Sequence, residues 1–315
     1  MLHLRMRVPA RQLDQVVALL DDNPTTVNVL VVSDSYRKPA GDALVSADIA
    51  RESAQRLLNG LRQLGIPQNG SIAIADNETL LSHAATEAEH RAPGSPIDGV
   101  VWDIVENNAR EDIRPSFAFV AFLTLAALIA GVGRLQDQPI LIVGAMVVGP
   151  EFAPMAAICF AIARPRPSLL PRALVTLVGG YLIATAIATA IWTLLYVMGA
   201  FSHAAIAHRP LTDFIVQPNW WSFFIAVLAG IAGVLSLTTD KSSILVGVFI
   251  SVTTIPAIGT LALGISTLDG HVVHESLVQL GVNIAGIIIA GTLTLLILKL
   301  TWERVKMPGP APRVP

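Results

Sequence analysis

Charged side chains are scarce in this chain. Asp, Glu, Lys and Arg make up 14% of its 315 residues, whereas apolar residues make up 53%. The mean hydropathy is +0.62, which excludes an ordinary soluble protein and indicates an integral membrane protein surrounded by a lipid bilayer. The net charge of −2 gives no basic surface for nucleic acid, so no nucleic-acid partner is expected.

Cysteine is scarce as well. The single cysteine, Cys159, cannot form an internal disulfide and lies within an apolar segment, where it is interpreted as a small core residue. The first residues, MLHLRMRVPARQLDQ, contain no continuous apolar stretch, so no cleaved signal peptide is expected. No phosphate loop, nucleophile triad or metal cluster is recognisable. We therefore expect neither an enzyme nor a bound cofactor.

The few charges are unevenly distributed, and this predicts four parts. Arg, Asp and Glu are frequent up to Arg114, but residues 116–301 are largely uncharged. We expect a cytoplasmic domain over 1–75, a join over 76–115, a membrane domain over 116–302 and a cytoplasmic tail over 303–315.

The first part alternates strand and helix patterns. Strands are expected at 2–8, 27–33, 42–49 and 71–75, and helices at 11–20 and 52–64. This β-α-β-β-α-β order predicts a ferredoxin-like α+β domain. In the join, an apolar stripe is formed by Ile97, Val100, Val101, Ile104 and Val105. A helix lying on the membrane surface fits this stripe, and packing against the first domain is the alternative.

Six apolar segments are long enough to cross a bilayer, which requires about 20 residues. They cover roughly 116–133, 139–163, 171–199, 219–237, 243–266 and 276–300. The flanking Lys and Arg residues predict their orientation. With a cytoplasmic N-terminus, nine lie inside and two, Arg134 and Arg209, lie outside. We therefore expect a multi-pass protein of the inner or plasma membrane with both termini in the cytoplasm.

The six segments read as two copies of three. Asp137 precedes Val143-Gly144 by six residues, and Asp240 precedes Val246-Gly247 by six residues, with a shift of 103 between the two sets. An odd number of spans per copy makes the copies face opposite ways. This 3+3 inverted repeat is typical of secondary transporters.

The second and fifth segments are each interrupted by proline near the centre, in GAMVVGPEFAP (144–154) and GVFISVTTIP (247–256). Proline removes a backbone donor, and the freed polar groups need protein or a watery cavity as partners. We expect broken helices that line a site, with simple proline kinks as the alternative. The candidate site residues are Gly144, Gly149, Pro150, Glu151, Pro154, Ser251, Thr253, Thr254, Pro256 and Asn283.

Glu151 is the only ionisable side chain in the interior of the six segments, and its mate at the shift of 103 is Thr254. An intramembrane carboxyl group is costly and indicates function, whereas capping a restarted helix is the alternative. Asn283 in the sixth segment is expected to hydrogen-bond across helices, either in the site or in packing.

Several of these stretches resemble a known family. The stretches 144–157, 163–166, 247–256 and 44–65 are similar to the membrane-protein family known as domain of unknown function 389. Met146, Pro150 and Pro154 occupy the places of its first motif, while many members have an apolar residue at the place of Glu151. The resemblance covers nearly the whole chain and implies a membrane location without a particular activity.

Together these patterns favour a transporter-like protein that moves a small ion or solute between two broken helices. The alternative is a membrane-anchored sensor or assembly module whose ferredoxin-like domain binds a ligand or partner. Because small domains of this type often pair through sheet edges, we also expect a homo-oligomer.

Overall fold

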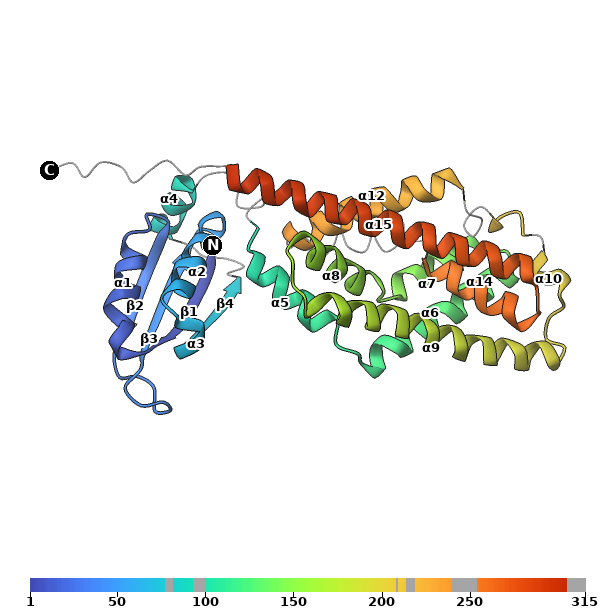
Figure 1. The fold of residues 1–315 in the computed structure, drawn as a ribbon, viewed down its shortest axis with the longest axis horizontal. Coiled ribbons are helices and arrows are strands. Elements are labelled where there is room, and N and C mark those ends of the chain that lie inside the picture. The colour runs from blue at the N-terminus through green and yellow to red at the C-terminus, as the bar shows by residue number, and fades with distance from the viewer. Residues whose placement is uncertain (77–81, 93–99, 208, 214–218, 240–253, 305–315) are drawn as a thin grey trace. The chain divides into compact units, whose positions relative to one another are not determined.

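The computed structural model describes residues 1–76, 82–92, 100–207, 209–213, 219–239 and 254–304. Contacts divide the chain into two compact units, unit 1 with residues 1–105 and unit 2 with residues 106–304. The division lies inside the stretch 76–115 that was expected to join two domains. Each unit is described separately below (Figure 1).

Unit 1 is built around a four-stranded antiparallel sheet with the strand order β2-β3-β1-β4. The strands are β1 (Leu2–Val8), β2 (Thr26–Val32), β3 (Ala43–Ile49) and β4 (Ser71–Asp76). The main helices are α1 (Leu13–Asp21), after a short 3-10 turn at Ala10–Gln12, and α2 (Arg51–Gln63). This is the β-α-β-β-α-β order expected from the sequence, with boundaries that differ by two residues or fewer.

Two short helices in unit 1 were not expected. Helix α3 (Ile66–Asn69) follows Gly65, whose φ of +75° lies in the left-handed region that glycine adopts without strain. Helix α4 (His83–Arg91) begins after Ser82, whose hydroxyl accepts a hydrogen bond from the Ala85 N–H at 3.4 Å. Serine at this position is a standard helix-capping signal.

The core of unit 1 comes from alternate residues of the strands and one face of each main helix. In β1, Leu2, Leu4, Met6 and Val8 are all fully buried, as the alternation of side chains in a strand requires. Val101 is 1% exposed in the same core, and Ile104 packs against it. The apolar stripe of the join therefore packs on the first domain, and the expected membrane-surface helix is wrong at these two positions.

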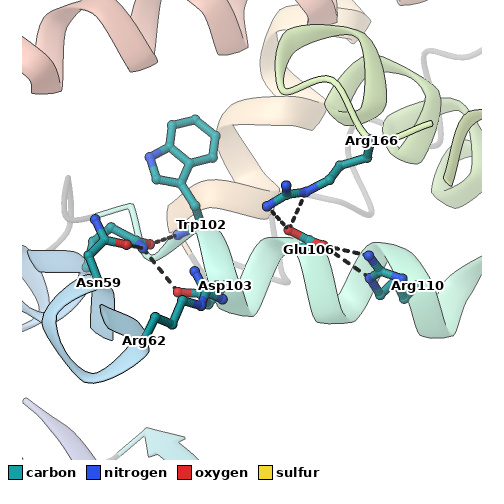
Figure 2. A network of polar contacts seen from close by, with 8 residues as sticks. Asn59, Arg62, Trp102, Asp103, Glu106, Arg110 and Arg166 are labelled. Carbon is teal, nitrogen blue, oxygen red and sulfur yellow. Dashed lines mark hydrogen bonds and ion pairs between the residues drawn. The ribbon is translucent and has the colours of Figure 1, made fainter. Parts of the chain in front are cut away.

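Helix α5 (Trp102–Asp112) begins with polar ties to α2 (Figure 2). The Trp102 N–H donates to the Gln55 side-chain oxygen at 2.8 Å, and the Gln55 amide donates to Asp103 at 3.1 Å. Arg62 forms an ion pair with the same Asp103 carboxylate. These contacts hold the first turn of α5 in unit 1.

Unit 2 is helical. Its long apolar helices are α6 (Phe117–Leu135), α9 (Leu169–Val197), α12 (Trp220–Thr239) and α15 (Gly270–Arg304). Within the described ranges, unit 2 also contains the end of α5 and the helices α7 (Pro139–Val148), α8 (Phe152–Ala163), α10 (Ala204–Ala207) and α14 (Thr254–Ser266). The described residues thus contain four helices that could span a membrane, or five when α7 and α8 count as one bent span. Six spans are not confirmed, because α14 is short and residues 240–253 lie outside the described ranges.

Helix α15 begins six residues earlier than the apolar segment 276–300. The reason is a cap, since the Asp269 carboxylate accepts hydrogen bonds from the His271 and Val272 N–H groups at 3.0 and 3.2 Å. A carboxylate at this position satisfies donors that the first helical turn leaves free. The helix therefore extends into a polar stretch that hydropathy alone assigns to a loop.

In Figure 1, α15 and α9 run along opposite sides of unit 2, with α8 and α14 between them, and both shorter helices contact both long ones. Glycine permits close approach at two crossings. A Cβ at Gly259 of α14 would lie 2.7 Å from the Ala127 carbonyl oxygen of α6, and one at Gly230 of α12 would lie 2.7 Å from the Ile287 carbonyl oxygen of α15. Such contacts between small residues are a main source of helix association in membranes. Cys159 is fully buried in α8, as a core residue should be.

Candidate functional site

The second apolar segment is broken where the sequence places Gly149 and Pro150. Helix α7 ends at Val148, helix α8 begins at Phe152, and the two are bent by 56°. The Gly149 N–H still donates to the Ala145 carbonyl at 3.2 Å, but Pro150 has no N–H to continue the ladder. The predicted break in this helix is confirmed. The corresponding break in the fifth segment lies outside the described residues, which resume at Thr254.

Glu151 lies in this break and is buried, with 2% of its surface exposed. Its Oε1 accepts a hydrogen bond from the Thr254 Oγ1 at 2.9 Å, and Thr254 is fully buried at the start of α14. The two residues are 103 positions apart, the shift between the predicted copies. The structure thus brings together the carboxyl group and the repeat mate that the sequence assigned to it.

The second carboxyl oxygen of Glu151 has a different environment. Although Oε2 is buried, it has no hydrogen-bond partner among the residues that the structure describes. Glu151 occupies the N-cap position of α8 but makes no side-chain capping hydrogen bond. The capping interpretation therefore has no geometric support, and one carboxyl oxygen remains available to a ligand or proton.

Gly149 lies against this free oxygen. A Cβ at Gly149 would overlap Glu151 Oε2 and would lie 2.7 Å from the Ile255 side chain of α14. Only a residue without a side chain permits this close approach of α7, the carboxyl group and α14. The absence of a side chain at Gly149 therefore leaves room for the Glu151 carboxyl group and Ile255.

Tyr181 of α9 is a member of the site that sequence reasoning missed. It is 7% exposed, and its helix contacts both α8, which begins beside Glu151, and α14, which begins at Thr254. Its hydroxyl forms no hydrogen bond with the described residues. The one phenol group in the run 174–191, whose other polar side chains are three threonines, was the available signal, because a buried tyrosine hydroxyl normally requires a partner.

The structure describes most of the other candidate residues, and they differ in burial. Pro154 and Pro256 are buried in the first turns of α8 and α14, and Pro150 is half-buried beside Glu151. Asn283 is buried in α15. Gly144 is exposed on α7, where a Cβ would meet nothing within 4 Å, so the structure does not bring it to the site. Ser251 and Thr253 lie outside the described residues.

Charge around Glu151 is unbalanced. No ion pair found within the described ranges includes Glu151, whereas the buried Arg134 of α6 is paired with Asp213 at 2.6 Å. A buried carboxyl group without a basic partner is stable when it is protonated or when a cation lies beside it. The geometry can therefore hold a proton or a small cation between the α7–α8 break, α14 and α9.

Comparison with known proteins supports the resemblance drawn from the motifs. The chain is 27% identical over 216 residues to an uncharacterized protein of Methanocaldococcus jannaschii, which covers 67% of this chain and 62% of the relative. The chain thus spans less than two thirds of that relative's length. No solved structure matches the chain. Residues 146–289, which include the Glu151 break and α14, match the family described as "Domain of unknown function (DUF389)", and this match confirms the family resemblance.

Proposed function

We propose that this protein moves a small ion or solute across a membrane, through a site where the α7–α8 break meets the start of α14. The observation that carries the proposal is the buried Glu151, bonded to Thr254 through one oxygen and free of described partners at the other. Intramembrane carboxyl groups of this kind typically bind ions or relay protons. A proton or cation is favoured, because an ionised carboxylate would repel an anion.

The packing of unit 2 supports a twofold repeat. Helices α6, α7–α8 and α9 correspond to the first copy, and α12, α14 and α15 to the second. Helix α8 contacts α15 of the other copy as well as α9 of its own, and α14 contacts α6 and α9 of the other copy as well as α15 of its own. This reciprocal exchange is expected when each middle helix crosses into the opposite half of an inverted repeat.

The Glu151–Thr254 contact adds a geometric argument. Under a twofold rotation, two equivalent residues are separated by twice their distance from the axis, so equivalent residues in contact must lie beside it. The 2.9 Å hydrogen bond therefore supports a site on the axis between the copies. Transporter sites are commonly located there, near the bilayer midplane. The nine-to-two distribution of Lys and Arg favours cytoplasmic termini in an inner or plasma membrane.

Proton movement provides the test. The purified full-length protein would be placed in liposomes that contain the pH-sensitive dye pyranine, and an imposed pH gradient would be followed by fluorescence. Glu151→Gln retains the shape of the side chain but cannot ionise, so proton flux should be lost. Glu275→Gln is the matched control, since Glu275 lies near the start of α15 and pairs with His271 at 3.5 Å.

Equal flux in wild type and Glu151→Gln would remove the proton role of the carboxyl group. If Glu151 only caps α8, flux would persist and stability would fall by about 1 kcal/mol. Repeating the assay with radioactive sodium distinguishes a cation site, because sodium uptake would then depend on the same residue.

An assembly role is the second candidate, and one surface of unit 1 favours it. Strand β2 is at the edge of the sheet, and Leu30 and Val32 on it are 54% and 41% exposed. An exposed apolar edge strand readily pairs with another chain, which supports the expected homo-oligomer. Leu30→Lys should lower the molar mass measured by light scattering if β2 joins two copies.

A further inference from the structure

A second place in unit 2 is chemically unlike the Glu151 site. A pocket of about 530 Å³ lies among the end of α5, the stretch before α6 and the first turns of α9. Its charged lining residues are three arginines, Arg110, Arg114 and Arg172. Ser168 and Thr176 add hydroxyl groups, and the rest of the lining is apolar. A concave site with positive charge and apolar walls fits an anionic amphiphile.

The charge of this pocket is available to a ligand. The side chains of Arg114 and Arg172 are exposed, and neither forms an ion pair with any residue in the described ranges. The charge comes from the side chains and not from the start of α9, because Pro171 has no N–H and the Leu169 N–H donates to the Arg166 carbonyl at 3.0 Å.

Hydrogen bonds within the protein fix the position of the residues around the pocket, and those of Glu106 with Arg110 and Arg166 are drawn in Figure 2. The Glu106 carboxylate accepts hydrogen bonds from Arg110 at 2.7 Å and from Arg166, in the connection from α8 to α9, at 2.8–2.9 Å. Burial by itself would raise the pKa of Glu106, but the bonds from these two arginines outweigh it and lower the pKa. On α9, the Thr176 hydroxyl donates to the Ile113 carbonyl at 2.7 Å.

An apolar surface continues from the pocket along α9. Val175, Val178 and Leu182 are 66%, 51% and 67% exposed, and their spacing of three and four residues puts them on one helix face. This face lies on a helix that is long and apolar enough to cross a membrane. An acyl chain can cover it, whereas a free inorganic anion cannot.

We propose that the pocket binds the headgroup phosphate of an anionic phospholipid, with an acyl chain along Val175, Val178 and Leu182. Arg114 and Arg172 bind the phosphate directly. Arg110 lines one side of the pocket, and its charge is already paired with Glu106. The site is independent of the transport proposal, because it requires neither Glu151 nor α14.

Native mass spectrometry of the purified full-length protein in detergent tests the proposal, with phosphatidylglycerol as probe and phosphatidylcholine for comparison. Wild type should retain one phosphatidylglycerol molecule in preference to phosphatidylcholine. The double variant Arg114→Gln/Arg172→Gln should bind it roughly 25-fold more weakly, at roughly fivefold per arginine near a membrane surface. The control double variant Arg56→Gln/Lys299→Gln removes the same charge elsewhere and should bind as wild type does.

Arg114→Lys/Arg172→Lys keeps both charges and should retain most of the affinity, which separates charge loss from misfolding. Unchanged phosphatidylglycerol affinity in the glutamine double variant would overturn the site. Equal binding of phosphatidylcholine would overturn the role of headgroup charge. If millimolar inorganic phosphate displaces the lipid from wild type, the pocket is a site for free phosphate and the lipid assignment is wrong.

Discussion

Adding one methyl group at Gly149 should disrupt the candidate site. The new Cβ would overlap Glu151 Oε2 and would lie 2.7 Å from the Ile255 side chain. Contacts this short do not occur between real Cβ atoms and their neighbours, so α7, α14 or the carboxyl group must move. Insertion of a methyl group into a packed interior costs typically about 1–3 kcal/mol.

For a cost of about 2 kcal/mol, a unit of this size should lose roughly 4–8 °C in melting temperature. Unfolding of the purified protein can be followed by the fluorescence of its five tryptophans. Proton flux in liposomes should also fall in Gly149→Ala, because the displaced Glu151 carboxyl group can no longer keep its hydrogen bond to Thr254.

Gly144→Ala is the matched control. The same methyl group is added five residues earlier, inside α7, where it meets nothing within 4 Å. Replacing a helical glycine by alanine should stabilise the helix by about 0.5–1 kcal/mol, so the melting temperature should stay or rise slightly. If Gly149→Ala and Gly144→Ala behave alike, the close approach around Glu151 is not real and the site geometry is refuted.

Three further predictions concern other parts of the chain. Arg134→Gln breaks a buried ion pair and should destabilise the protein by about 3–5 kcal/mol in thermal unfolding, whereas Arg134→Lys should cost less; equal costs would contradict a specific role of the guanidinium. The pKa of Glu106 is lower in the folded chain than in the unfolded chain. Glu106 therefore adds to the free energy of unfolding at pH values above its unfolded pKa, and this stabilisation is lost as the pH falls through its folded pKa. Glu106→Gln should therefore reduce the fall in the free energy of unfolding between neutral and acid pH. An unchanged pH dependence would contradict a stabilising role of the bonds from Arg110 and Arg166. On a background without Cys159, a cysteine at Ser202 should react with an impermeant thiol reagent outside cells and one at Ser168 should not; the reverse pattern would overturn the orientation.

Much of the local structure was predictable because its causes are local. Alternation of apolar residues placed β1 at Leu2–Val8 without error, and the Gly149-Pro150 pair marked the end of α7. Proline and glycine act on the backbone at their own positions, so no tertiary information is needed. The sequence also placed Glu151 and Thr254 in one candidate site, because the shift of 103 residues makes them mates in the predicted repeat.

Tertiary packing decided what local patterns left open. The stripe containing Val101 and Ile104 fits a membrane surface and a protein core equally well, and the contacts of unit 1 decide for the core. Helix α15 extends to Gly270 because Asp269 caps it, although hydropathy ends the segment at 276.

The sequence by itself determined a membrane protein with a small α+β domain ahead of its apolar helices, since apolar composition and the periodicity of strands and helices are properties of the sequence. The membership of Tyr181 in the Glu151 site and the gathering of Arg114 and Arg172 around one pocket were decided only by tertiary structure. These groups are separated by tens of residues, and no local rule specifies which helices pack together. At the pocket, the start of α9 is joined to the stretch that carries Arg114 by a tertiary contact, the hydrogen bond from the Thr176 hydroxyl to the Ile113 carbonyl at 2.7 Å.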